Sequence, residues 1–405
     1  MIAGCGGGGF SATAQAAKSA YVANFNDNTV SQYTRDATTG ALTPMAPASA
    51  VPAGSNHRSV TVDPAGKYAY VANYGANTVS QYTIDATTGA LTANAAASAV
   101  PAGINPRSVT VDPTGKYAYV ANFTDNTVSQ YTIGTTGGLT ANGSAVLAVG
   151  TGPISVAVDP TGKYAYVANS GSTGSNGVSA YSIGTTGLLT LIGTATTGNN
   201  PYFVSVDPTG KYVYVPNAAN GTVSQYSIGA TGALTTIGMA VAAGTGAGTG
   251  SVAVDPTGKY AYATNTVPNT VSQYTIGTTG ALTANAASAT VATGSIPTSL
   301  AFDPTGKYAF VTNAAGNSIS QYTVGATGAL TANGVPLMAA NVARVLRLAT
   351  TPHSIVVDPT GKYAYVVNQA SKTVAQYSIS ATGTLTPTGA TVATGVKPYN
   401  IVLAP

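Results

Sequence analysis

The sequence of 405 residues is 44% hydrophobic and contains 25 tyrosines, but only 6% of its residues are charged. A disordered chain would be poor in apolar residues and rich in charge, so this composition predicts a folded, mainly β protein. The net charge of +4 is small and no basic run occurs, which excludes nucleic acid as an expected partner. No apolar stretch approaches the ~20 residues that a membrane-spanning helix needs.

The first 17 residues are predicted to be a tether ahead of the folded domain. They contain the letters I-A-G-C, ending at Cys5, which resemble the lipobox of bacterial lipoproteins, in which the cysteine carries the lipid. Four glycines follow and form a flexible spacer. Only Met1 precedes these four letters, so either a signal lies upstream or the match is chance and Cys5 is a free thiol. We expect lipidation at Cys5, and a membrane contact only through that lipid.

A repeat of about 48 residues dominates the rest of the chain. The turn D-P-[TA]-G-K-Y recurs from Asp63, Asp112, Asp159, Asp207, Asp255, Asp303 and Asp358. In the period 108–141, alternating runs at 108–111, 117–122 and 128–133 and a short run from 139 predict four strands, separated by turn residues. Four antiparallel strands per repeat are typical of a propeller blade.

The strand types predict a closed ring of eight blades. The second, third and fourth strand types each occur eight times, whereas the first type is missing before residue 18 and recurs alone at 398–405. The C-terminal strand therefore completes the first blade and leaves no open edge. The predicted fold is an all-β, eight-bladed β-propeller over residues 18–405, closed by its last strand.

The repeat V-D-P-T-G-K-Y-A-Y-V-A-N, followed by V-S-Q-Y, resembles that of the YVTN family of bacterial propellers. That family includes lactonase-like proteins related to 6-phosphogluconolactonase. The resemblance implies a propeller fold over residues 18–405 and, as one functional alternative, lactone hydrolysis. Those relatives commonly have seven blades, whereas eight are expected here.

Residues that recur in every blade are interpreted as structural. Tyr68, Tyr70 and Tyr82 and their counterparts are expected to pack between blades. Each D-P-x-G-K turn carries one lysine four residues after its aspartate, so local charge cancellation is favoured over a cationic ring of lysines.

A candidate ligand site lies where the repeat is broken. Propeller topology places the loop that enters each inner strand beside the channel, on the face opposite the D-P turns. One position per blade there gives Arg58, Arg107, Ile154, Tyr202, Gly250, Thr298, His353 and Tyr399, followed by Asn400. From these we select Arg58, Arg107, Tyr202, His353, Tyr399 and Asn400 as a site for a carboxylate, phosphate or sugar; unconstrained loop variation is the alternative.

An insert at 335–351 lengthens the last interval to 55 residues. Its apolar residues have helical spacing, interrupted by Arg344 and Arg347, so a short helix acting as a lid or partner contact is expected; a tolerated surface insertion is the alternative.

Three functions remain open from the sequence. We expect an exported, lipid-anchored platform on the bacterial cell envelope that binds a protein, a glycan or a small anionic ligand. The first alternative is a lactonase-like hydrolase in which His353 transfers protons and Arg58 and Arg107 stabilise charge; the second is a structural surface protein. With no glutamate and two histidines, the supply of catalytic groups is thin, and neither a metal nor a cofactor is predicted.

Overall fold

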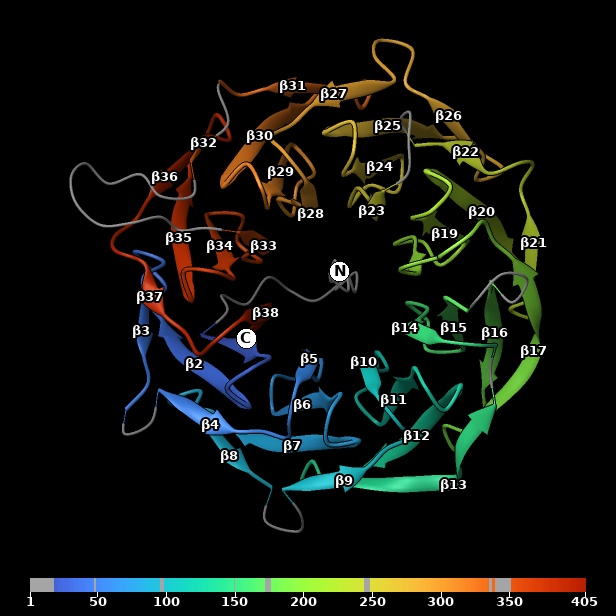
Figure 1. Ribbon diagram of the computed structural model, residues 1–405, viewed down its shortest axis with the longest axis vertical. Coiled ribbons are helices and arrows are strands. Elements are labelled where there is room, and N and C mark those ends of the chain that lie inside the picture. The colour runs from blue at the N-terminus through green and yellow to red at the C-terminus, as the bar shows by residue number, and fades with distance from the viewer. Residues whose placement is uncertain are drawn as a thin grey trace.

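The computed structural model describes residues 18–46, 49–94, 98–148, 150–171, 176–243, 248–334, 337–338 and 351–405. These residues form eight antiparallel sheets arranged radially around a channel, as Figure 1 shows, and contain no α-helix. The predicted eight-bladed propeller is confirmed. The insert with Arg344 and Arg347, and the segment with Cys5, lie outside the described residues.

The blades are numbered 1 to 8 from the N-terminus, and each has an inner strand at the channel followed by a second and a third strand. The inner strands are β38 (Pro398–Ala404), β5 (His57–Val62), β10 (Pro106–Val111), β14 (Pro153–Val158), β18 (Ser205–Val206), β23 (Thr249–Val254), β28 (Pro297–Phe302) and β33 (Pro352–Val357). The second strands are β1 (Ser19–Asn24), β6 (Tyr68–Asn73), β11 (Tyr117–Asn122), β15 (Tyr164–Asn169), β19 (Tyr212–Asn217), β24 (Tyr260–Asn265), β29 (Tyr308–Asn313) and β34 (Tyr363–Asn368).

The third strands are β2 (Thr29–Arg35), β7 (Thr78–Ile84), β12 (Thr127–Ile133), β16 (Gly177–Ile183), β20 (Thr222–Ile228), β25 (Thr270–Ile276), β30 (Ser318–Val324) and β35 (Thr373–Ile379). The outer strand is continuous in blades 3 and 4, as β13 (Leu139–Ala148) and β17 (Leu189–Thr196). It is split in the other blades, into β3 (Leu42–Pro44) and β4 (Ala50–Pro52), β8 (Leu91–Ala93) and β9 (Ala99–Pro101), β21 (Leu234–Thr236) and β22 (Val241–Ala242), β26 (Leu282–Ala284) and β27 (Thr290–Ala292), β31 (Leu330–Ala332) and β32 (Leu337–Met338), and β36 (Leu385–Pro387) and β37 (Val392–Ala393).

The D-P turns owe their shape to the aspartate and the glycine. In blade 3, Asp112 is buried and its carboxylate accepts the backbone N–H groups of Lys116 at 2.8 Å and Tyr117 at 2.7 Å. Gly115 has a φ of +71°, which a side chain would strain. The aspartate therefore stabilises the turn through the backbone.

The hydrophobic core lies between consecutive blades. One cluster joins Tyr70 and Val79 of blade 2 to Val109 and Tyr131 of blade 3, all buried. The tyrosine hydroxyls also reach across: Tyr70 donates to the Gly137 carbonyl at 2.9 Å. The expectation that repeated tyrosines pack between blades is confirmed, and each blade depends on both neighbours for its core.

The ring is closed by the chain termini. Strand β1 pairs antiparallel with β38, with Ser19 opposite Ala404 and Val22 opposite Ile401. In Figure 1 the red C-terminal strand lies beside the blue strands of blade 1. Pro405 comes next to Gly66, where the other blades bring a D-P turn, so the C-terminus also replaces the missing turn.

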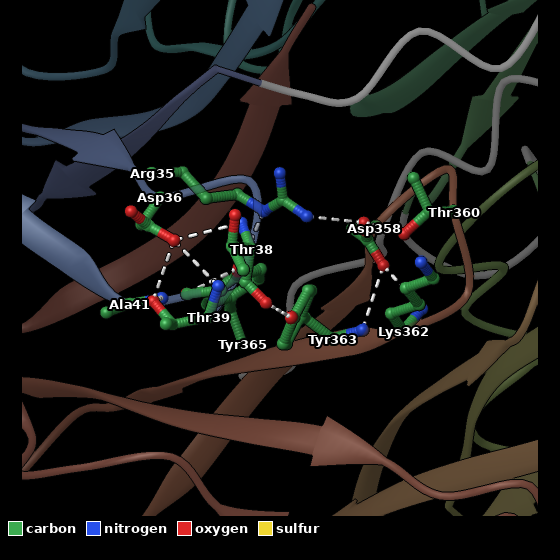
Figure 2. Close-up of polar contacts among 11 residues, drawn as sticks. Arg35, Asp36, Thr38, Thr39, Ala41, Asp358, Thr360, Lys362, Tyr363 and Tyr365 are labelled. Carbon is green, nitrogen blue, oxygen red and sulfur yellow. Dashed lines mark hydrogen bonds and ion pairs between the residues drawn. The ribbon is translucent and has the colours of Figure 1, made fainter.

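A buried ion pair lies at the seam between blades 1 and 8 (Figure 2). Arg35 ends β2, at the position that carries Ile or Val in the other seven blades. Its guanidinium donates to the Asp358 carboxylate at 2.7 Å and to the Tyr365 hydroxyl at 2.8 Å, and both charged side chains have no exposed surface. No other ion pair occurs among the described residues. The pair therefore marks the closing seam.

Glutamine side chains join neighbouring blades by hydrogen bonds. Gln32 of blade 1 accepts the Leu91 N–H of blade 2 at 2.7 Å, and Gln81 accepts the Leu139 N–H of blade 3 at 2.6 Å. The same bond is made at the closing seam, from Leu42 to Gln376. Blade 4 has Ala180 at this position. A gap of about 60 Å³ lined by Ala180, Ile192, Gly193, Thr194, Ala233 and Leu234 lies there instead.

Changing either partner of the buried ion pair is expected to have unequal effects. Asp358→Asn leaves the Arg35 charge buried without its counter-ion and should destabilise the protein by about 3 kcal/mol. Arg35→Ile restores the residue type of the other third strands, and its Asp358 keeps the backbone donors of Lys362 and Tyr363, so it should cost less than about 1 kcal/mol. The midpoint of urea unfolding measures both. The double variant should recover most of the loss; a double variant as unstable as Asp358→Asn contradicts this account.

Introducing a glutamine at position 180, where the other blades have one, should stabilise the junction of blades 4 and 5. Ala180→Gln fills the gap and supplies an acceptor for the Leu234 N–H, with an expected gain of about 1 kcal/mol. Hydrogen exchange at the Leu234 amide should slow about fivefold or more. Ala180→Met, which fills the space without an acceptor, is the matched control, and equal protection in both variants would show that packing alone acts there.

Candidate functional site

The inner strands begin on the face opposite the D-P turns, and their first residues surround the channel mouth. Arg58 lies in β5, Arg107 in β10, His353 in β33 and Tyr399 in β38, while Tyr202 precedes the short β18. His353 and Tyr399 are buried and the other three are half-buried. The packing of consecutive blades thus sets side chains from distant parts of the sequence around one opening.

Arg58 lies among three aromatic rings. Its guanidinium carbon is 4.6 Å from the ring centroid of Tyr74, 5.2 Å from that of Phe25 and 5.7 Å from that of Tyr399. Its Nη1 also donates to the Tyr399 hydroxyl at 3.5 Å. Cation–π contacts of this kind hold the guanidinium in place at the channel mouth.

Arg107 continues the alternation of cations and rings. Its guanidinium carbon is 3.7 Å from the Phe123 centroid and 5.7 Å from that of Tyr74. Its Nε has no hydrogen-bond partner, and no carboxylate within ion-pair distance, among the described residues. Burial, and next the neighbouring Arg58 charge, lower the pKa of Arg107, although a guanidinium stays protonated at neutral pH. An anion bound here would relieve the repulsion between the two arginines.

The aromatic partners were not predicted. Phe25, Tyr74 and Phe123 follow the repeated asparagine that ends the second strand in blades 1 to 3. The equivalent residues of the other five blades are Ser170, Ala218, Thr266, Ala314 and Gln369. An aromatic residue at this position in three consecutive blades, beside the two arginine-bearing strands, is therefore a signal that the sequence contains. We call Phe25, Arg58, Tyr74, Arg107, Phe123 and Tyr399 the cation–aromatic cluster.

Tyr202 and His353 flank this cluster. Burial and the neighbouring Tyr399 raise the pKa of Tyr202, against the opposing effect of Arg107 and Arg58, so its hydroxyl is neutral and able to donate at neutral pH. The His353 ring packs on Tyr399 with centroids 4.6 Å apart. Of the predicted residues, these two therefore lie with Arg58, Arg107 and Tyr399.

Asn400 is not part of the cluster in the same way. It lies in β38 opposite Ala23 of β1, and no side-chain contact joins it to the arginines among the interactions of the described residues. Its selection as a ligand residue stays a prediction, as does the lid role of Arg344 and Arg347, which lie outside the described residues.

The acids on this face are committed to the backbone. The Asp27 carboxylate accepts the N–H of Val396, and the Asp125 carboxylate accepts that of Ile104 at 2.5 Å. Lys397 adds a third cation, with its Nζ 4.8 Å from the Phe25 centroid. Three cations, Arg58, Arg107 and Lys397, thus face two carboxylates beside blades 1 to 3, which leaves this part of the mouth with a small net positive charge.

His57 is the second histidine and lies behind the arginines. It is fully buried, its Nδ1 is 3.2 Å from the Gly54 carbonyl, and burial lowers the pKa of its imidazole. A neutral, buried ring is a packing residue here. No group of three or more metal-ligating side chains gathers anywhere in the described ranges.

Comparisons with known proteins agree with this architecture. Residues 9–154 match the model of the family described as "Lactonase, 7-bladed beta-propeller". A comparison with curated proteins gives no significant match. Within the part of the chain that the structure describes, no helix is long and apolar enough to cross a membrane.

Several solved structures superpose on the whole ring. A "putative 6-phosphogluconolactonase" from Bacteroides fragilis is 20% identical, covers 98% of this chain and 100% of its own, and has a TM-score of 0.64. The periplasmic gluconolactonase of Pseudomonas aeruginosa is 17% identical, covers 96% and 99%, and has a TM-score of 0.65. The dihydro-heme d1 dehydrogenase NirN is 12% identical, covers 97% and 76%, and has a TM-score of 0.67. Identities this low show the fold alone.

The resemblance predicted from the repeat is thus confirmed. Residues 9–154 match the lactonase propeller family, and the chain departs from that family's description by having eight blades instead of seven.

Proposed function

We propose that the protein is a lactonase-like hydrolase that acts on a lactone bearing a negative charge at the channel mouth. One observation carries this proposal: two adjacent arginines, Arg58 and Arg107, are held between aromatic rings at a part of the mouth with a small net positive charge. The family match over residues 9–154 supports lactone chemistry, and the neighbouring rings offer the apolar faces on which a sugar ring packs.

The side chains allow a simple division of roles. Arg107 binds the anionic group of the substrate by charge-assisted hydrogen bonds, and Arg58 with the Tyr399 hydroxyl stabilises the carbonyl oxygen as it becomes an oxyanion. His353, buried against Tyr399, accepts a proton from the attacking water. The ring C–O bond then breaks, and the leaving hydroxyl takes up the proton to give the hydroxy acid.

This proposal favours the alternative over the expected binding platform. The family match and the gluconolactonase similarity speak for hydrolysis, whereas a scaffold role, a structural surface role and a lipid anchor have no support from the comparisons. The periplasmic similarity supports an extracytoplasmic location, which we retain as part of the proposal. Protein or glycan capture without turnover remains the competing outcome.

A pair of lactones that differ by one phosphate tests the site. We expect Arg107→Gln to lower kcat/KM for 6-phosphogluconolactone about 10- to 100-fold, because a charge-assisted bidentate contact is lost, and to leave gluconolactone nearly unchanged. His353→Gln should lower kcat for both lactones at least 100-fold. The activities of the unchanged protein and of the two variants are measured as the initial rates at which each lactone is converted to its acid.

Lys372→Gln is the matched control, since it removes a charge from the same face outside the cluster. An equal loss in the control would mean that the general field, not Arg107, acts on the substrate. Equilibrium binding of the lactone without any turnover would instead establish a binding protein. If the protein neither binds nor hydrolyses either lactone, the proposed site is refuted.

A further inference from the structure

Eight lysines stand at one equivalent position, one in each blade. They directly precede the second strands, in the order Lys18, Lys67, Lys116, Lys163, Lys211, Lys259, Lys307 and Lys362. All eight are exposed. Lys18 belongs to the set because its carbonyl accepts the Arg35 N–H as that of Lys67 accepts the Ile84 N–H. Because every blade has the same strand order, all eight lie on the D-P turn face, which we call the lysine face.

The expected cancellation of these charges by the turn aspartates does not occur through ion pairs. Asp63 is buried, and one of its oxygens accepts the backbone N–H groups of Lys67 and Tyr68, both at 2.6 Å. No lysine ammonium lies within ion-pair distance of a carboxylate among the described residues. The negative charges thus lie beneath the surface and the positive charges lie on it. A partner in contact with the face meets the lysines first.

The lysine face carries few exposed acids. Its other turns, between the third and outer strands, begin with Asp36 in blade 1 and Asp85 in blade 2, both exposed. The same position in the other six blades is Gly134, Gly184, Gly229, Gly277, Gly325 or Ser380. From blade 3 to blade 8 the exposed charge on this face is therefore only positive.

The lysines form a continuous collar around the channel. Each D-P turn packs against the turn of the preceding blade: a Cβ at Gly115 would lie 3.6 Å from Pro64, and one at Gly361 would lie 3.1 Å from Pro304. Residues that recur in every blade usually serve the fold, but these ammonium groups make no ion pair or cation–π contact in the described residues. Neither an ion pair nor a cation–π contact among the described residues therefore accounts for the lysine in each blade.

The chain also enters the ring on this face. Lys18 is the first described residue; it directly precedes β1 and belongs to the collar. The predicted lipid site, Cys5, lies thirteen residues before Lys18 in the sequence.

We infer that the lysine face docks on an anionic phospholipid bilayer. The collar occupies equivalent positions in all eight blades, spreads its charge over the whole ring and presents polar turn residues, so it fits a headgroup surface without insertion. Because the aspartates lie directly beneath, attraction acts at contact distance and is sensitive to salt. This docking is independent of the proposed hydrolysis, which takes place on the opposite face.

Vesicle binding by the full, unlipidated chain tests the inference. We expect co-sedimentation with phosphatidylglycerol/phosphatidylcholine vesicles, none with phosphatidylcholine alone, and release at 0.5 M NaCl. Each lysine at an anionic surface changes partition about fivefold, so Lys163→Gln with Lys259→Gln should weaken binding about 25-fold. Both residues are exposed, so circular dichroism should show an unchanged fold.

Lys372→Gln with Lys397→Gln removes the same charge from the opposite face and should change vesicle binding less than about twofold. An equal loss in the two pairs, or no binding to anionic vesicles, overturns the inference. Inorganic polyphosphate is the soluble comparison. A chain that binds polyphosphate but not vesicles has a polyanion site, and docking on a bilayer is then wrong.

Discussion

The pairing of β1 with β38 is the contact on which the rest of the structure depends. The core is distributed between blades, so a blade with one free flank exposes tyrosines and valines that are otherwise fully buried. Only a closed ring gives every blade two neighbours. The N- and C-terminal segments supply the eighth junction, and the Arg35–Asp358 pair, the Gln376–Leu42 bond and the Tyr365 hydroxyl all reinforce it.

Closure also explains why one seam is chemically different. The other junctions are made by neighbours in sequence, whereas this one joins residues more than 300 positions apart. A buried ion pair contributes little net energy, but an unpaired buried charge is costly, so Arg35 favours an alignment in which an aspartate of the neighbouring blade meets it. An equivalent turn aspartate occurs in seven blades, so the pair fixes the alignment of the closing seam and not the identity of the blade. Ile or Val suffices where chain connectivity already fixes the neighbour.

Much of the fold is predictable from the sequence because the same pattern of strands and turns recurs in every repeat. The turn at Asp63, the interblade tyrosines and the C-terminal strand are all predictable from spacing and residue type. Contacts between different repeats are harder to predict. Arg35 is visible as an exception to an Ile position, but its partner Asp358 is known only once the ring closes. The turn lysines show the same limit: an aspartate lies four residues before seven of them, but whether its carboxylate meets the ammonium or the backbone N–H groups is decided by the turn, and here it binds the backbone.

Half of the candidate site is predictable from the sequence. Arg58, Arg107 and Tyr399 break a repeat at the channel mouth, whereas Phe25 and Tyr74 lie in a different loop, where aromatic residues also depart from the repeat. The two faces of the ring therefore differ. Variation confined to blades 1 to 3 creates a local cation–aromatic cluster on one face, while strict repetition of lysine creates a collar on the other. A disc resting on its collar would turn the cluster away from the bilayer, where a soluble lactone has free access to it.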